Sequence, residues 1–246
     1  MIPELFSIGP FTVHSFGLMM ALGFVSAGAV TYFGFKRAGF NPETVYWITI
    51  AAAVGGIVGS KIHYLLLHPD NLADDPLATA FSGAGLVWYG GFIGGLAAGL
   101  LVTRLYRIPL GKAINAAAPA MAIGYGFGRL GCFLNGDDYG QPSTLPWAMA
   151  FPEGSPPVHV AVQPTQLYEA AAAFAIFFLL LYLRRWFKRG WSLFLVFLVL
   201  AGVERFLVEF VRWNRPGQTQ QQVLAAATAV VAAAVLIWVE RRHESH

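Results

Sequence analysis

The stretch "QLYEAAAAFAIFFLLLYLRRWFKR", residues 166–189, decides the fold class. Its first part, residues 166–183, contains a single charged side chain, Glu169, and basic residues follow directly. A helix needs about 20 mostly apolar residues to cross the roughly 30 Å hydrocarbon core of a bilayer. Basic residues gather in the loops on the cytoplasmic side. The stretch therefore predicts a membrane-spanning helix whose end lies in the cytoplasm.

Similar apolar stretches recur along the whole chain. Of the 246 residues, 57% are hydrophobic and 12% are charged, and the mean hydropathy is +0.58. Soluble domains carry about 25% charged residues. We predict an all-α, polytopic membrane protein in which residues 1–246 form one transmembrane domain and residues 136–165 form an external cap or loop. The expected spans lie near residues 15–35, 45–67, 86–103, 113–134, 166–183, 192–211 and 222–239.

The distribution of basic residues predicts the orientation. If the chain crosses seven times from an external N-terminus, the outward segments contain only Arg212 and Arg215. Eleven of the sixteen basic residues fall in the inward segments: Lys36, Arg37, Arg104, Arg107, Lys112, Arg184, Arg185, Lys188, Arg189, Arg241 and Arg242. This asymmetry predicts an external N-terminus and a cytoplasmic C-terminus. The pI of about 9.1 is then a signal of orientation, and we expect no nucleic-acid partner. The first stretch lacks the basic start of a cleavable signal peptide, so we expect it to remain as a span.

Polar residues within the predicted spans converge on the outer half of the membrane. With a rise of 1.5 Å per residue, Arg129 lies roughly 25 Å and Arg205 about 20 Å from the cytoplasmic ends of their spans. Tyr89, Gln166 and Glu169 begin spans that enter from outside. A charge inside a bilayer usually pairs with another charge or lines a cavity. The convergence predicts a site that faces the outer leaflet.

Two interpretations apply to the charges near residue 205. At 100° per residue, Arg205, Glu209 and Arg212 form one stripe of a helix, and Arg205 and Glu209 are spaced i,i+4 for pairing. The stripe is either a purely structural pairing or part of a binding site with one surplus positive charge. Glu204 lies about 100° away from the stripe and could reach another helix.

Arg129 belongs to "GRLGCFLNGDDYG", residues 128–140, and has no acidic neighbour before Asp137. The guanidinium group is better suited to phosphate than an ammonium group is, because its planar fork can donate two hydrogen bonds at once. Glycines on both sides would let a lipid headgroup or another backbone approach closely. We therefore expect Arg129 to meet an anion.

The other polar residues of this stretch have simpler interpretations. Gly136 follows an asparagine and predicts a turn, because glycine adopts positive φ without strain. We expect Asp137 and Asp138 to be solvated. Cys132, the single cysteine, has no histidine near it and is expected to be a packing residue. The histidines lack the i,i+4 spacing of a helical metal site, so we expect no metal.

Five stretches together resemble the bacterial prolipoprotein diacylglyceryl transferases, in the order of that family and over nearly the whole length. They are "FSIGPFTVHSFGLMMALGF" at 6–24, "YGGFIGG" at 89–95, "GRLGCFLNGDDYG" at 128–140, "QPTQLYE" at 163–169 and "ERFLVEFVR" at 204–212. The resemblance implies transfer of a diacylglyceryl group from phosphatidylglycerol to the lipobox cysteine of a lipoprotein precursor, without metal or cofactor. It also implies a multi-pass protein of the bacterial inner membrane.

The resemblance assigns roles to particular residues. Arg129 and Arg205 match two family arginines and are expected to clamp the lipid phosphate, where negative charge develops as glycerol 1-phosphate leaves. Tyr89 stands where many members have a histidine that is a candidate base, and it is expected to be the third catalytic residue. Asn135, Gln166 and Glu169 match polar members of the family motifs and are expected to orient headgroup or substrate. The other residues expected to bind substrate are Gly136, Glu209, Arg212 and His14. For His14, a satisfied histidine at the membrane interface is the alternative interpretation.

Three departures from the family pattern leave a second function open. Tyr89 is a poor base at neutral pH, because the pKa of a tyrosine is about 10. Phe16 replaces a common tyrosine, and Cys132 replaces an asparagine. These changes allow a paralogue that binds phosphatidylglycerol or lipoprotein precursors without catalysis, or with altered substrate choice. A transporter is the third hypothesis, although the chain shows no internal repeat of the kind many transporters have.

Overall fold

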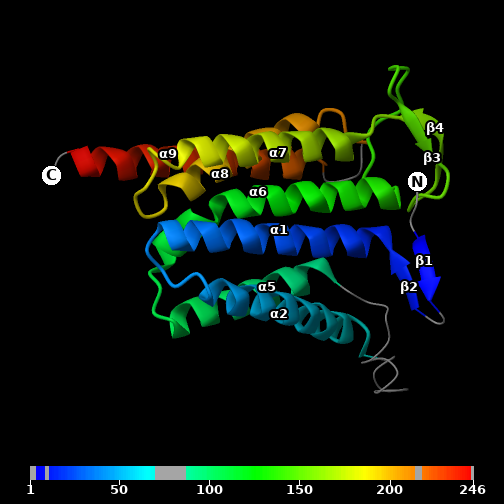
Figure 1. Ribbon diagram of the computed structural model, residues 1–246. Coiled ribbons are helices and arrows are strands. Elements are labelled where there is room, and N and C mark those ends of the chain that lie inside the picture. Colours follow the sequence, from blue (N-terminus) through cyan, green and yellow to red (C-terminus); the bar gives the residue numbers. More distant parts are fainter. Residues whose placement is uncertain (1–3, 9–10, 70–86, 214–217, 245–246) are drawn as a thin grey trace. The chain divides into compact units, whose positions relative to one another are not determined.

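The computed structural model describes residues 4–8, 11–69, 87–213 and 218–244, and its main elements are helices (Figure 1). Seven helices lie within this part of the chain, close to the seven predicted stretches. They are α1 (Ser15–Arg37), α2 (Thr44–Leu67), α5 (Trp88–Leu105), α6 (Leu110–Asn135), α7 (Thr165–Leu183), α8 (Ser192–Val208) and α9 (Gln218–Glu244).

Four of these helices are long and apolar enough to cross a membrane: α1, α2, α7 and the Gln220–Arg241 part of α9. Helix α5 is apolar over Tyr89–Leu105, which is shorter. Helix α8 has 17 residues and ends before the predicted residue 211. The membrane character of the chain is therefore supported. The count of seven spans and the orientation of the termini stay predictions.

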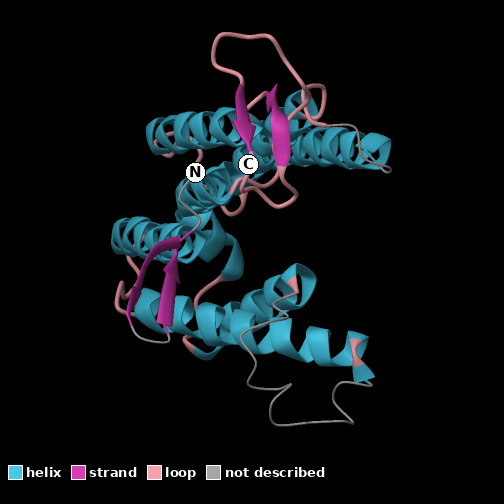
Figure 2. Ribbon diagram, turned by 90° about the vertical axis from the view of Figure 1, so that its right-hand side faces the viewer, coloured by secondary structure: helices cyan, strands magenta, loops and turns pink. Residues whose placement is uncertain are grey.

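Two short antiparallel hairpins add to the helices, and an all-α prediction did not anticipate them (Figure 2). In the first, β1 (Glu4–Ile8) pairs with β2 (Phe11–His14) just before α1. In the second, β3 (Met149–Phe151) pairs with β4 (Val158–Val162) within the segment predicted as an external loop. The strands are so short that an alternating pattern hardly shows in the sequence.

The contacts divide the chain into two compact units, which are described separately. Unit 1 comprises residues 1–31 and 114–246, and unit 2 comprises residues 32–113. Two compact units are compatible with a single transmembrane domain, which stays a prediction.

The core of unit 1 lies between α6, α7 and α8. Its buried side chains are Ala118, Ala122, Phe177, Leu180, Leu193 and Val196. A second cluster lies between α6 and α7 in sequence, where Tyr139 stacks on Phe151 with the ring centroids 5.6 Å apart. This second cluster gives the 136–165 segment a packed interior of its own.

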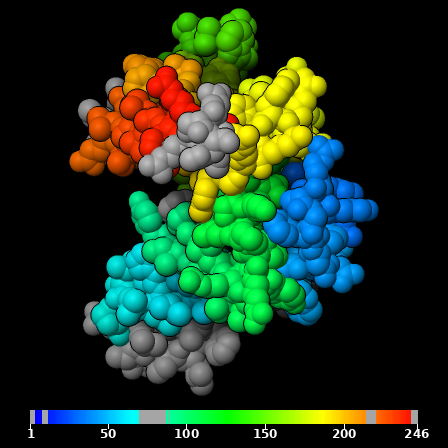
Figure 3. All heavy atoms as spheres, turned by 90° about the vertical axis from the view of Figure 1, so that its left-hand side faces the viewer, coloured from blue at the N-terminus to red at the C-terminus, as the bar shows by residue number. Residues whose placement is uncertain are grey.

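A buried asparagine organises the end of unit 1 at which α7 ends and α8 begins, the end that faces the viewer in Figure 3. The Asn115 amide nitrogen donates to the Phe187 carbonyl at 3.1 Å, and its Oδ1 accepts from the Leu193 backbone N–H at 2.6 Å. Unpaired N–H groups at a helix start need such an acceptor. The asparagine thus closes the connection between the two helices.

In unit 2, α2 and α5 pack side by side through glycines (Figure 1). Gly55 and Gly59 on α2 face Gly90 and Gly94 on α5. A Cβ atom added at any of these four positions would approach the backbone of the opposite helix to under 3.0 Å. Glycines spaced by four residues allow helix backbones to approach closely in lipid, where association depends on packing.

Replacing Gly59 by leucine should separate these two helices. The added side chain meets backbone atoms, which cannot rotate away, and overpacking of this kind costs about 1–3 kcal/mol. We expect a lower unfolding temperature and a lower yield of folded protein in detergent. Gly17→Leu is the matched control, because a Cβ atom at Gly17 meets nothing within 4 Å. Equal stability of the two variants would contradict the proposed packing role.

Candidate active site

The end of α6 positions Arg129 and the turn that follows it. Gly136 has a φ of +74° and donates its backbone N–H to the Cys132 carbonyl at 2.9 Å, which ends the helix. Arg129 lies nearly two turns before Asn135, the last residue of α6. Its Nε donates to the Tyr125 hydroxyl at 2.9 Å, and its guanidinium carbon lies 4.9 Å from the Tyr125 ring centroid. Tyr125 was not among the predicted site residues.

Asp138 corrects one prediction. The residue has a φ of +58°, and its carboxylate accepts from Arg129 Nη1 at 3.0 Å and lies 3.4 Å from Arg212 Nη1. Its side chain remains 35% exposed. Asp138 was expected to be solvated, but the turn after α6 directs it toward two arginines. Arg129 is therefore not a lone charge.

Glu169 is the common partner of three arginines. Its side chain is fully buried. Oε2 lies 2.5 Å from Arg129 Nε, while Oε1 accepts from Arg205 Nη1 at 3.2 Å and from Arg212 Nη2 at 2.7 Å. One arginine from α6 and two from α8 and the residues directly after it thus converge on the first turn of α7. Hydrogen bonds between charged groups are stronger than neutral ones, so Glu169 fixes the positions of the guanidinium groups around it.

The predicted pairing of Arg205 with Glu209 is confirmed, because Arg205 Nη2 forms an ion pair with Glu209 Oε1. The same nitrogen donates to the side-chain oxygen of Gln221 on α9 at 2.7 Å. Arg212 Nε lies 3.9 Å from Glu209. The stripe is thus paired within itself, as the structural interpretation predicts, and it also contacts Glu169. Its part in a binding site stays a prediction.

Arg212 lies just beyond α8, where its backbone forms an isolated bridge to Gly140. The pKa of Arg212 lies above its ordinary value: burial opposes the charged form, but the neighbouring Glu169 and Asp138 carboxylates outweigh this effect. The guanidinium therefore remains fully charged despite being largely covered.

The 136–165 segment holds these elements together through hydrogen bonds to its backbone. The buried Gln166 donates its Nε2 to the Asp137 carbonyl at 2.5 Å, and the Thr165 hydroxyl donates to the Asp138 carbonyl at 2.9 Å. The Gln141 backbone N–H donates to the Val211 carbonyl at 2.9 Å. The start of α7, the end of α6 and the end of α8 are thereby fixed relative to one another.

The remaining predicted residues differ in their placement. Asn135 ends α6 and donates to the Asp137 carboxylate at 2.7 Å, next to Gly136. His14 ends β2 opposite Glu4 and is exposed, and among the described residues the contacts of the arginine cluster do not include it. Tyr89 lies at the start of α5 in unit 2, with an exposed side chain. The substrate contacts assigned to these residues stay predictions.

One group of side chains has the spacing of metal ligands. The sulfur of Cys132 and carboxylate oxygens of Asp137 and Asp138 lie within 4.8 Å of one another. Asp138, however, pairs with Arg129 and Arg212, whose positive charges oppose a divalent cation. Asp137 already accepts the Asn135 amide. The donor set suits the arginines and the turn better than a metal ion.

The cluster balances three arginines against three carboxylates. Arg129, Arg205 and Arg212 carry the positive charges, and Glu169 and Glu209 are buried, while Asp138 is the carboxylate nearest solvent. Arg129 Nη2 makes no hydrogen bond to any residue in the described part of the chain. An anion could therefore bind Nη2 and replace the exposed carboxylate without disturbing the buried pairs. Fixed guanidinium groups of this kind stabilise an anionic leaving group.

Comparison of the sequence with known proteins points to one family. The sequence profile of the family described as prolipoprotein diacylglyceryl transferase matches residues 3–239. A phosphatidylglycerol–prolipoprotein diacylglyceryl transferase of Clostridium tetani is 32% identical over 217 residues, which cover 87% of each chain. The protein of the same name from Chromohalobacter salexigens is 31% identical over 255 residues, covering 98% of this chain and 93% of the relative.

A third relative of this name, from a Marinomonas species, is 34% identical over 215 residues, covering 85% of this chain and 79% of the relative. The matched region contains every residue of the arginine cluster. With a profile match over almost the whole length and relatives above 30% identity, this chain belongs to the prolipoprotein diacylglyceryl transferase family.

Proposed function

We propose that this protein transfers the diacylglyceryl group of phosphatidylglycerol to the cysteine thiol of lipoprotein precursors. A thioether forms, and glycerol 1-phosphate leaves. The observation that carries the proposal is the convergence of Arg129, Arg205 and Arg212 on one buried carboxylate in a chain of this family. The name of the relatives states the same donor and acceptor.

The arginines would act on the phosphate of the lipid. As the carbon–oxygen bond to phosphate breaks, the electron pair remains on a phosphate oxygen and adds negative charge there. Arg129 would meet this charge through Nη2, and through Nη1 once Asp138 yields its place. Arg205 and Arg212 would contribute from the other side of Glu169. Removing one such donor typically costs 10²–10³-fold in rate.

The proposed reaction is a nucleophilic displacement at carbon. It transfers no electron and needs no group carrier, so no cofactor belongs to the proposal. The lipobox cysteine is the nucleophile, which leaves Cys132 as a half-buried packing residue. We place the site toward the outer leaflet of the bacterial inner membrane, because the distribution of basic residues favours an external N-terminus.

The other predicted residues are proposed to support the site or to contact substrate. Asn135 and Gly136 shape the turn beside Arg129, while Gln166, Glu169 and Glu209 hold the arginines and the turn. His14 and Tyr89 are proposed to contact substrate directly. The family position of Tyr89 suggests a base, but a neutral phenol accepts protons weakly. Tyr89→Phe tests the hydroxyl group. Loss of activity in the variant would show that the reaction needs the hydroxyl, and full activity would show that Tyr89 is not the base.

A mass-spectrometric assay tests the function. Purified protein in micelles that contain phosphatidylglycerol is mixed with a synthetic lipobox peptide, and the mass of the peptide is followed. We expect the gain of one diacylglyceryl group, and no gain when the peptide cysteine is replaced by serine. Binding of phosphatidylglycerol without any gain, beside a working transferase of the family, would favour the non-catalytic or re-specialised paralogue. The departures at Tyr89 and Phe16 motivate that alternative.

A further inference from the structure

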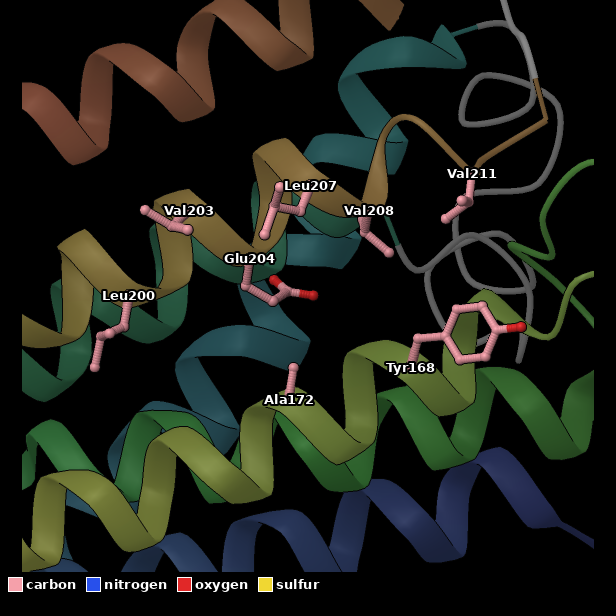
Figure 4. Close-up of a pocket in the computed structure, with 8 residues that line it drawn as sticks. All are labelled: Tyr168, Ala172, Leu200, Val203, Glu204, Leu207, Val208 and Val211. Atoms are coloured by element: carbon pink, nitrogen blue, oxygen red, sulfur yellow. The ribbon is translucent and has the colours of Figure 1, made fainter.

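A pocket of about 380 Å³ opens between α7 and α8 (Figure 4). Tyr168 and Glu204 are its polar lining residues, and the others are alanine, leucine and valine. The pocket and the cluster share the same helices. Tyr168 directly precedes Glu169, and Glu204 directly precedes Arg205, so the lining residues face one side and the paired charges face another.

Glu204 is the carboxylate among the residues that line this pocket. Its Oε1 is buried and has no hydrogen-bond partner in the described part of the chain, which is also true of one carboxylate oxygen each of Asp137, Glu169 and Glu209 outside the pocket. Figure 4 shows the carboxylate directed into the space between the two helices. Glu169, Glu209 and Asp138 all form ion pairs with arginines. Buried polar groups are normally satisfied, and an ionisable group in a membrane helix usually has a function.

The proposed reaction needs a proton acceptor that the arginine cluster does not supply. A cysteine thiol has a pKa near 8.5, so only a few per cent is the reactive thiolate at pH 7. Several charged or titratable groups lie near Glu204 and set its environment. They are Tyr125 and Arg129 on α6, Tyr168 and Glu169 on α7, and Arg205 and Arg212 on or just after α8.

The chemistry of the pocket selects one occupant. A carboxylate repels a lipid phosphate and makes no favourable contact with an acyl chain. A thiol, in contrast, can donate its proton to the carboxylate. The apolar lining suits the apolar residues that surround a cysteine in a membrane-inserted segment. At about 380 Å³ the pocket is near the lower end of ligand sites, which span roughly 300–1,000 Å³. That size suits a few peptide side chains better than a two-chain lipid.

We propose that Glu204 accepts the proton of the substrate thiol in this pocket, an inference that rests on the proposed transferase function. The sulfur then forms its bond to the glyceryl carbon while the bond from that carbon to the phosphate oxygen breaks. Glycerol 1-phosphate leaves with the electron pair next to the arginines. The proton passes from Glu204 to water or to the departing phosphate, which restores the carboxylate.

Glu204→Gln tests the proton transfer, because the amide keeps the shape of the side chain and cannot take up the proton. At pH 7 we expect the transfer rate with a cysteine peptide to fall about 10²-fold, which is typical of a lost general base. The rate of the variant should then rise about tenfold per pH unit below the thiol pKa, following the thiolate fraction. Glu204→Asp should recover part of the rate, and Glu43→Gln, at an exposed position of unit 2, should leave it unchanged.

A selenocysteine peptide separates proton transfer from a structural role. The selenol is already ionised at neutral pH, so the Glu204→Gln variant should act on it within a few-fold of the unmodified protein. Equal impairment with both peptides at every pH would overturn the assignment, and so would an unimpaired variant. If the unmodified protein acts on neither peptide while it still binds phosphatidylglycerol, the proposed transferase function is wrong. That outcome differs from one in which only the Glu204 assignment is wrong.

Val203→Trp tests the occupant of the pocket. The indole would fill part of the space, and we expect the KM for the peptide to rise about tenfold with little change in the KM for phosphatidylglycerol. Val230→Trp, on the exposed face of α9, is the matched control. A rise confined to the KM for phosphatidylglycerol would show that a lipid occupies the pocket and would overturn this part of the proposal.

Discussion

Arg129→Ala should lower the rate of diacylglyceryl transfer by about 10²–10³-fold, because the leaving phosphate loses a fixed positive charge. The variant should still fold. Glu169 keeps two arginines, Arg205 and Arg212, and the lost side chain is not part of the apolar core. The measurement is the rate of mass gain of a lipobox peptide, with the unfolding temperature recorded on the same preparation.

Two further variants sharpen this result. Arg129→Lys keeps the charge but not the fork that reaches Tyr125, Glu169 and Asp138 at once, so it should recover only a small part of the rate. Arg185→Ala removes an exposed arginine beyond the far end of α7 and should leave the rate unchanged. An Arg129→Ala variant with full turnover would exclude the phosphate role.

Glu169→Gln should have the largest effect on stability. It removes the fully buried negative charge shared by Arg129, Arg205 and Arg212 and leaves their charges partly uncompensated. Breaking a buried ion pair in this way costs about 3–5 kcal/mol, which corresponds to a fall in unfolding temperature on the order of 10 °C. Thermal unfolding in detergent measures the fall, and Glu43→Gln provides the exposed control.

A second substitution distinguishes charge imbalance from lost packing. In the Glu169→Gln, Arg212→Gln double variant one surplus positive charge is removed, so part of the stability should return while the transfer activity remains low. The two residues are in direct contact at 2.7 Å, and their effects should therefore not add. If the double variant is as unstable as the sum of the single variants, the pairing between these two residues contributes little.

The helices were predictable because their signal is long and local. Each predicted apolar stretch overlaps an observed helix, with differences of a few residues at the ends. The hairpins were not predicted, because β3 and β4 have three and five residues in a proline-rich segment. Their pairing depends on the cluster around Tyr139 and Phe151, which forms only in the folded chain.

Some members of the arginine cluster were predictable from the sequence, but their connections were not. Arg205 and Glu209 are four residues apart, so their pairing follows from helix geometry alone. Glu169 lies 36 residues from Arg205 in sequence, and its place between three arginines requires the tertiary structure. Asp138 was expected to be solvated, because aspartate is common in turns and the sequence does not reveal its backbone conformation. The positive φ of Asp138 directs its side chain toward Arg129, and this is visible only in the folded structure.

The hydrogen bonds of the 136–165 segment bear on the speed of the reaction. They tie the backbones of α6, α7 and α8 together at the end where the guanidinium groups meet. The positive charges are therefore in position before any lipid arrives, and little reorientation is needed while the phosphate departs. Groups that are fixed in this way stabilise a developing charge better than water does, because water molecules must reorient toward each new charge.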